Sequence, residues 1–171
     1  MTVSASPGYF RQFAAYGAWA NARLYDTAAR LDDAKRRKDR GAFFGSIHNT
    51  LNHLLLGDRI WIARLTGRDH GVTRLDDVPY PDFEALRRAA EAETAGIIRF
   101  CDELDEARLA SICHYRTISG GGQPGALPVT SILAHLFNHQ THHRGQVHAM
   151  LTQELPDVPG LDLLIYLMTA R

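Results

Sequence analysis

Apolar side chains recur every three or four residues through four long segments, and this spacing constrains the fold more than any other feature. It places the apolar side chains along one face of a helix. The pattern is clearest in residues 9–31, where it includes Phe10, Phe13, Leu24 and Leu31. Four helices of about 20 residues pack by default as a bundle, so the sequence predicts an all-α four-helix bundle.

Local signals give the expected helix ends. We expect helices at residues 9–31, 42–65 and 130–155, a third long helix that Asp82 caps and that ends near residue 104, and a short C-terminal helix at 161–170. Gly67 follows the second helix where a helix C-cap favours glycine. Between the third and fourth long helices, glycines 120–122 separate two stretches of extended character. These residues predict a short glycine-rich extended insertion, of the size of a small hairpin.

Length and charge narrow the class of protein. The 171 residues fit a single domain spanning 1–171. Nineteen basic residues balance 19 acidic ones, so the formal net charge is zero. A balanced chain lacks the electrostatic footprint of a nucleic-acid or membrane-surface protein. No segment resembles a signal peptide or a membrane span of roughly 18 apolar residues. We therefore expect a cytoplasmic protein with neither nucleic acid nor membrane as partner.

The two cysteines form no recognisable motif. Cys101 and Cys113 lack a CxxC neighbour, so neither a zinc ribbon nor a redox motif is present. In a reducing compartment this arrangement favours free thiols over a disulfide.

Histidines are concentrated in the fourth long helix, where five of the chain's nine lie between residues 135 and 148. His139 and His143 are four residues apart and fall within the apolar arc of the helix. His135 lies at the edge of this arc and His142 lies further out. Two imidazoles one turn apart on a buried face can converge on one metal ion about 2 Å from each nitrogen.

The pair also has a purely structural interpretation, and a metal site needs a third ligand. Without a metal, the two imidazoles form a buried polar pair that Asn138, Gln146 or water must hydrogen-bond. The second helix offers His53, within the almost wholly apolar residues 51–56, and His48, which we expect in solvent near the helix start. His53 is the candidate third ligand, and a hydrogen-bonded core histidine is the alternative.

Three strings of residues together resemble a known family. They are residues 16–21 (YGAWAN), 52–61 (NHLLLGDRIW) and 138–146 (NHQTHHRGQ). The last string is the most specific, and the three occur in the order found in the DinB family of the DinB/YfiT-like metalloprotein superfamily. The resemblance implies a four-helix bundle with up-down-down-up connectivity. It also implies a nickel- or zinc-like ion bound by His53, His139 and His143, and a homodimer.

The resemblance and the residues are compatible with three kinds of function. Related branches of the superfamily include bacillithiol-type S-transferases and a mycothiol-dependent isomerase, so the resemblance implies a thiol-dependent S-transferase with a low-molecular-weight thiol as partner. An ion held by three neutral histidines can lower the pKa of a bound thiol or water. A metal-dependent hydrolase of a small substrate is therefore a second hypothesis, and a non-enzymatic metal-binding stress protein is a third. Asp58, Gln146 and Tyr115 are candidate acid/base or supporting groups.

Overall fold

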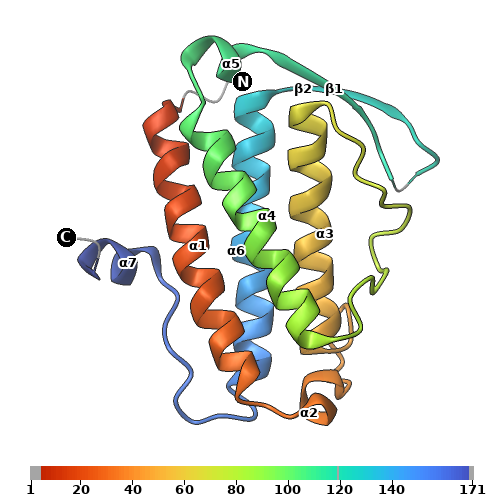
Figure 1. Ribbon diagram of the computed structural model, residues 1–171, viewed down its shortest axis with the longest axis vertical. Coiled ribbons are helices and arrows are strands. Elements are labelled where there is room, and N and C mark those ends of the chain that lie inside the picture. Colours follow the sequence, from red (N-terminus) through yellow and green to blue (C-terminus); the bar gives the residue numbers. More distant parts are fainter. Residues whose placement is uncertain (1–4, 119, 170–171) are drawn as a thin grey trace.

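The computed structural model describes residues 5–118 and 120–169, and this part of the chain is mostly helical. The elements, in chain order, are α1 (Pro7–Ala29), α2 (Asp33–Arg37), α3 (Ile47–Thr66), α4 (Phe83–Asp102), α5 (Glu106–Ala110), β1 (Ile112–Arg116), β2 (Pro124–Pro128), α6 (Val129–Leu151) and α7 (Leu163–Thr169). The four long helices α1, α3, α4 and α6 lie side by side, and α1 and α6 run opposite to α3 and α4 (Figure 1).

The small sheet corrects the prediction of an all-α chain. Strands β1 and β2 pair antiparallel, with Ile112 opposite Pro128 and Arg116 opposite Pro124. Gly120, Gly121 and Gly122 all have φ between 71° and 80° in the connecting loop, a conformation that side chains with a Cβ rarely adopt. The glycine-rich insertion therefore contains a hairpin, and its strands lie across one end of the long helices (Figure 1).

Helix starts follow capping chemistry. The Asp82 carboxylate accepts a hydrogen bond from the Ala85 amide, as the sequence predicts. The predicted start of the second long helix at residue 42 is wrong, because α3 begins at Ile47. Gly45 has a φ of 76°, which interrupts the helix, and the Ser46 hydroxyl then caps α3. The short helices α2 and α5 lie outside the segments in which the sequence predicts helices.

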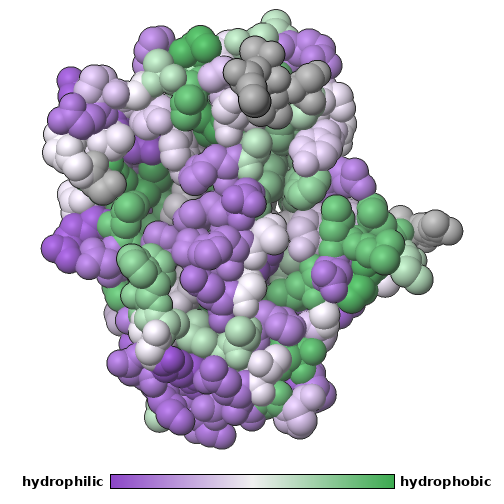
Figure 2. Space-filling view, turned by 180° about the vertical axis from the view of Figure 1, so that it is seen from behind, coloured by the Kyte–Doolittle hydropathy of each residue, from purple (hydrophilic) through white to green (hydrophobic). Residues whose placement is uncertain are grey.

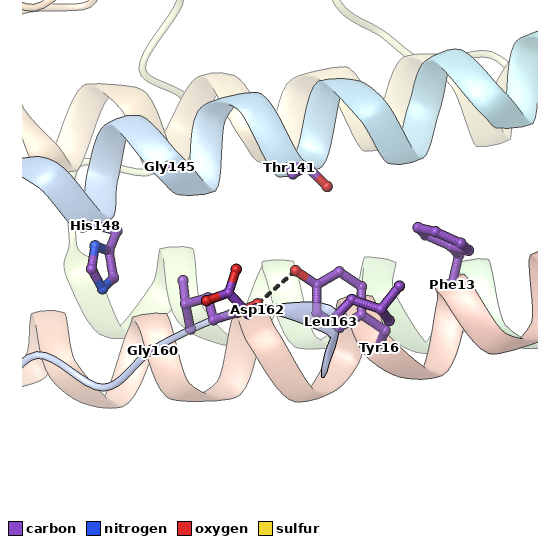
Figure 3. A pocket seen from close by; sticks show the side chains of 9 residues that line it. Phe13, Tyr16, Thr141, Gly145, His148, Gly160, Asp162 and Leu163 are labelled. Carbon is purple, nitrogen blue, oxygen red and sulfur yellow. Dashed lines mark hydrogen bonds between the residues drawn. The ribbon is translucent and has the colours of Figure 1, made fainter. Parts of the chain in front are cut away.

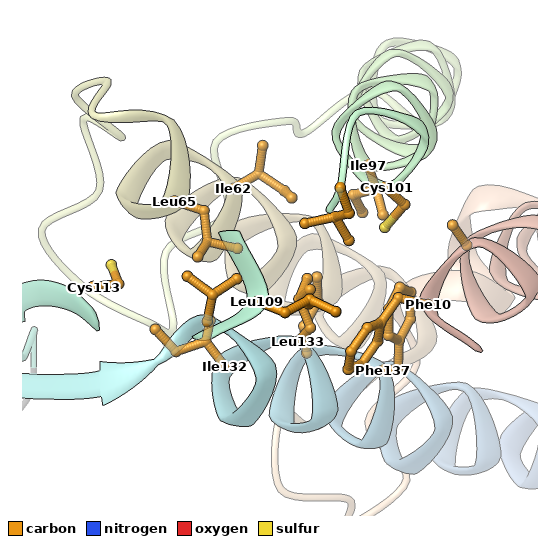
Figure 4. Packing of buried hydrophobic residues seen from close by; sticks show 14 residues of the cluster. Phe10, Ile62, Leu65, Ile97, Cys101, Leu109, Cys113, Ile132, Leu133 and Phe137 are labelled. Carbon is orange, nitrogen blue, oxygen red and sulfur yellow. The ribbon is translucent and has the colours of Figure 1, made fainter. Parts of the chain in front are cut away.

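The core of the described residues has two large apolar parts and a small third one of Leu56, Ile60 and Val72. One large part contains Phe10, Ile97, Leu133 and Phe137 beside the hairpin end, where side chains from α1, α4 and α6 meet (Figure 4). The other large part, near the opposite end, includes Leu24, Leu51, Phe83, Val147 and Leu151. No helix of the described residues has both the length and the apolarity needed to cross a membrane.

Between the two large apolar parts the core is polar. Asn21, Asp58, Gln140 and Arg144 are each at most 7% exposed. The Gln140 side chain donates to the Asp58 carboxylate at 2.9 Å, and Arg144 donates to Asn21 at 3.4 Å. These contacts join α3 to α6 and α6 to α1. The histidine cluster lies beside this layer, because Gln140 and Arg144 directly follow His139 and His143 in the sequence.

Candidate metal centre

The packing of α3 against α6 brings His53, His139 and His143 to one place. One ring nitrogen from each lies within 4.8 Å of the others, and the Nε2 atoms of His53 and His139 are 3.2 Å apart. Two nitrogens bound about 2.0 Å from one tetrahedral ion are about 3.3 Å apart. The separation therefore fits a shared divalent ion.

Hydrogen bonds orient two of the three rings. The His53 Nδ1 atom lies 2.8 Å from the Leu75 carbonyl oxygen, which only accepts, so Nδ1 carries the proton and Nε2 keeps its lone pair. The His143 Nδ1 atom lies 2.8 Å from the Gln146 side-chain oxygen and donates in the same way. Histidines that bind metals typically donate their other N–H to a carbonyl or carboxylate. Both rings thus present the atom a metal would take.

The third ring depends on a glycine. A Cβ at Gly57 would lie 2.6 Å from Cε1 of His139, closer than side chains pack. The missing side chain lets the His139 imidazole lie directly against α3, where its Nε2 reaches that of His53. The Nδ1 atom of His139 is buried and has no hydrogen-bond partner among the described residues.

Burial keeps the three imidazoles neutral. It lowers the pKa of His139 to about 3, and the neighbouring histidines His143 and His53 lower it further because adjacent positive charges repel. Burial also lowers the pKa of His143 to about 4, against the opposing effect of Gln146, and it lowers the pKa of His53. At neutral pH all three rings therefore hold lone pairs for a cation, and a metal ion need not displace protons.

Two cavities open beside the cluster, and His53 and Leu75 line both. The larger, of about 550 Å³, is lined by Phe43, Phe44, Asp76, His142, His143 and Gln146. The smaller, of about 320 Å³, is lined by Trp61, Arg64, Tyr115, His135 and His139, among others. Phe44 stacks on the His53 ring with centroids 3.9 Å apart and covers that ligand with an apolar face. Small molecules thus have two approaches to the cluster.

Other predicted residues are placed differently. The prediction that His48 is solvated is wrong: it is fully buried, and its Nε2 lies 2.9 Å from the Tyr80 carbonyl, because residues 68–82 fold over α3. Asp58 belongs to the polar core layer and not to the histidine cluster. Tyr115 lines the smaller cavity. Cys101 and Cys113 are buried free thiols.

A third cavity, of about 530 Å³, lies away from the cluster, between α1, α6 and the segment that leads into α7. The Tyr16 hydroxyl donates to the Leu161 carbonyl there at 2.7 Å (Figure 3). His148 also lines this cavity, and its Nε2 lies 3.2 Å from the Pro159 carbonyl. His148 therefore points away from the three clustered histidines.

Several contributors to the site escaped the sequence analysis. Gly57 carried a signal, since it lies four residues after His53 on the same helical face. Arg64 carried a weaker signal, because it follows His53 by eleven residues, which is about three helical turns. The Leu75 carbonyl left none, because every residue except the terminal one has the same backbone group.

The fold and the cluster define a class: a mostly helical protein with a three-histidine candidate metal centre between two long helices. The model of the DinB family matches residues 1–170, and the chain belongs to the DinB family. It is 26% identical over 150 residues to Protein DinB of Bacillus subtilis (strain 168), covering 81% of each chain. A crystal structure of a DinB-like protein from Bacillus cereus ATCC 10987 shares the fold, with a TM-score of 0.68 and 21% identity over 90% of this chain and 95% of that one.

Proposed function

We propose that this chain is a metal-dependent enzyme that binds one nickel or zinc ion through His53, His139 and His143. The observation that carries the proposal is the convergence of three ring nitrogens within 4.8 Å, beside two cavities. Imidazole ligands suit nickel and zinc among the common divalent ions. The packing of α3 against α6 supports the site, because it brings the helix that carries His53 against the helix that carries His139 and His143.

The bound ion would supply an open coordination position that lowers the pKa of a thiol or water. The protein's own residues prepare this position. Leu75 and Gln146 hold the Nδ1 protons of two ligands, so that the Nε2 atoms point to a common place. Phe44 limits the access of water to His53. Electrostatic attraction for an anion is stronger where water is partly excluded.

We infer that the reaction joins two molecules. The two cavities that His53 lines support transfer of a low-molecular-weight thiol to an electrophile, with one reactant in each cavity. Hydrolysis would need only one organic substrate beside water. Room for molecules in both cavities also favours an enzyme over a protein whose ion merely ties α3 to α6.

The ligand set is tested by replacing each histidine with alanine and measuring the metal content of the purified protein. Each of His53→Ala, His139→Ala and His143→Ala should lose most of the ion, because two neutral ligands hold it far more weakly than three. His148→Ala is the control and should keep it, since His148 faces the third cavity. Unchanged stoichiometry in all three single variants would refute the site.

The parent protein and the His143→Ala variant also test whether a thiol binds at the metal. Cobalt-loaded protein should change its visible spectrum saturably with glutathione, and His143→Ala should abolish the change. A spectrum that no thiol concentration alters would rule out the transferase. An equal response to unrelated anions such as azide would instead favour the hydrolase.

A further inference from the structure

Arg64 is a half-buried cation for which the described structure provides no acidic partner. Its guanidinium carbon lies 4.6 Å from the Trp61 ring centre and 4.9 Å from that of Tyr115. One nitrogen donates to the Arg116 carbonyl, and no carboxylate of the described residues forms an ion pair with the guanidinium. By contrast, Arg59 on the same helix pairs with Glu93. Burial also lowers the pKa of Arg64, as expected for a charge with too little solvation.

The cation and the histidine cluster line the same cavity of about 320 Å³. Aromatic rings form a continuous wall between them. Arg64 stands over Trp61, the Trp61 and His135 rings are 5.2 Å apart, and the His135 and His139 rings are 5.7 Å apart. At 1.5 Å per residue, Arg64 lies about 16 Å beyond His53 along α3. A molecule that reaches both must lie along this aromatic wall.

The hairpin adds a further ring beside Trp61, because the Tyr115 and Trp61 ring centres are 5.2 Å apart. Tyr115 on β1 faces Gly125 on β2, and a Cβ at Gly125 would lie 2.5 Å from Cζ of Tyr115. The ring therefore lies across the glycine and extends to the face of the Arg64 guanidinium. The pocket combines flat apolar walls with one fixed cation at its end.

We propose that this cavity is a substrate subsite in which Arg64 binds the carboxylate of a small organic acid with a flat, largely apolar body. The planar guanidinium fork matches a carboxylate with two parallel hydrogen bonds, and partial exclusion of water strengthens the pair. The Trp61 and Tyr115 rings, whose centres are 5.2 Å apart, both contact the guanidinium and restrict its orientation. The body of the acid points along the cavity toward the histidines, so its role as substrate rests on the proposed function. The binding of its carboxylate to Arg64 does not depend on the proposed function.

The test uses Trp61 as the reporter. The chain has two tryptophans, so Trp19→Phe leaves Trp61 as the only one. In this background, at constant ionic strength, benzoate should quench the fluorescence saturably. Benzamide, its neutral counterpart, should bind about tenfold more weakly or worse, because it lacks the charge that strengthens a hydrogen bond to Arg64.

Three variants assign the effect to Arg64. Arg64→Gln should weaken benzoate binding about tenfold or more, and Arg64→Lys, which keeps the charge but not the fork, should be intermediate. Arg68→Gln is the matched control, because it removes the same charge from an exposed position just beyond α3 and should bind as the parent does. If Arg64→Gln does not fold, Arg64→Lys decides. Parental affinity in the foldable Arg64 variant, or benzamide binding equal to that of benzoate, would overturn the proposal.

Titrations with and without zinc or nickel separate this inference from the proposed function. Arg64-dependent benzoate binding in a protein that takes up neither zinc nor nickel would support the subsite and overturn the metal-dependent enzyme. Zinc uptake without benzoate binding would overturn the subsite alone.

Discussion

At the scale of single residues, the missing side chain at Gly57 is what lets His139 approach α3. Gly57→Ala should raise helix propensity by about 0.5–1 kcal/mol, yet its Cβ would lie 2.6 Å from the imidazole and displace it. We therefore expect a folded protein whose zinc affinity falls about tenfold or more, as when other groups that position a ligand are lost. Competition with a chromophoric chelator measures this affinity.

Gly145→Ala is the matched control. A Cβ at Gly145, also within a helix, would meet no atom within 4 Å. The Gly145→Ala variant should gain the same helix propensity and keep the zinc affinity of the parent. Equal affinities in the two variants would show that the close approach at Gly57 is irrelevant to the site.

Asp58 should make stability depend on pH. Burial raises its pKa from 3.8 to about 7, although Gln140 and Arg144 oppose the rise. A folded-state pKa above the unfolded one contributes stability that is complete below pH 3.8 and is lost as pH rises to about 7. The side chain introduced by Asp58→Asn cannot ionise, and its amide oxygen can still accept the hydrogen bond from Gln140. The free energy of unfolding of Asp58→Asn should therefore rise relative to that of the parent by roughly 2–4 kcal/mol across this range.

Urea denaturation of the metal-free proteins at several pH values between 4 and 8 measures this difference. The buried histidines titrate in both proteins, so their contribution cancels in the comparison. A difference that does not vary with pH would contradict the assignment to Asp58.

At the scale of elements, a single amide makes two of the hydrogen bonds that tie the connector between α3 and α4 to α3. The Asn52 side chain donates to the Tyr80 carbonyl at 3.2 Å and accepts from the Tyr80 amide at 3.1 Å. Asn52 is fully buried, so Asn52→Ala should lower the free energy of unfolding by roughly 1–3 kcal/mol. The connector also carries the Leu75 carbonyl that orients His53, so zinc affinity should fall with it.

Chemical denaturation and hydrogen exchange at the Tyr80 amide measure the effect of this change. Asn49→Ala, on the same helix but without a side-chain hydrogen bond in the described structure, should leave both unchanged. Slow exchange of the Tyr80 amide in Asn52→Ala would show that other contacts hold the connector.

At the scale of the whole molecule, we propose a homodimer. The apolar stripe of α1 cannot form the dimer interface, because residues such as Phe10, Ala20 and Leu24 are buried within the chain's own core. Helix α7 instead leaves Leu164 and Met168 each 67% exposed, within an apolar patch at the side of the molecule (Figure 2). Contiguous exposed apolar surface of this kind marks interaction sites.

Sedimentation at micromolar concentration should show a particle near twice 19.1 kDa. The double substitution Leu164→Lys and Met168→Lys should give a monomer. Phe43→Lys is the control and should leave the dimer intact, because Phe43 is 88% exposed at a place outside α7. A monomer of the unaltered chain across the micromolar range would refute the dimer.

The sequence by itself determined the long helices, the Asp82 cap and the shared face of His139 and His143. These features depend on neighbours within about one turn, and apolar spacing and capping residues record them directly. Tertiary structure decided the rest. His53 meets His139 across 86 residues of chain. Its Nδ1 partner is a backbone carbonyl, and His48 is buried by a distant connector. Such contacts arise only when helices pack and loops fold over them, and a side-chain pattern does not encode which backbone group will face which helix.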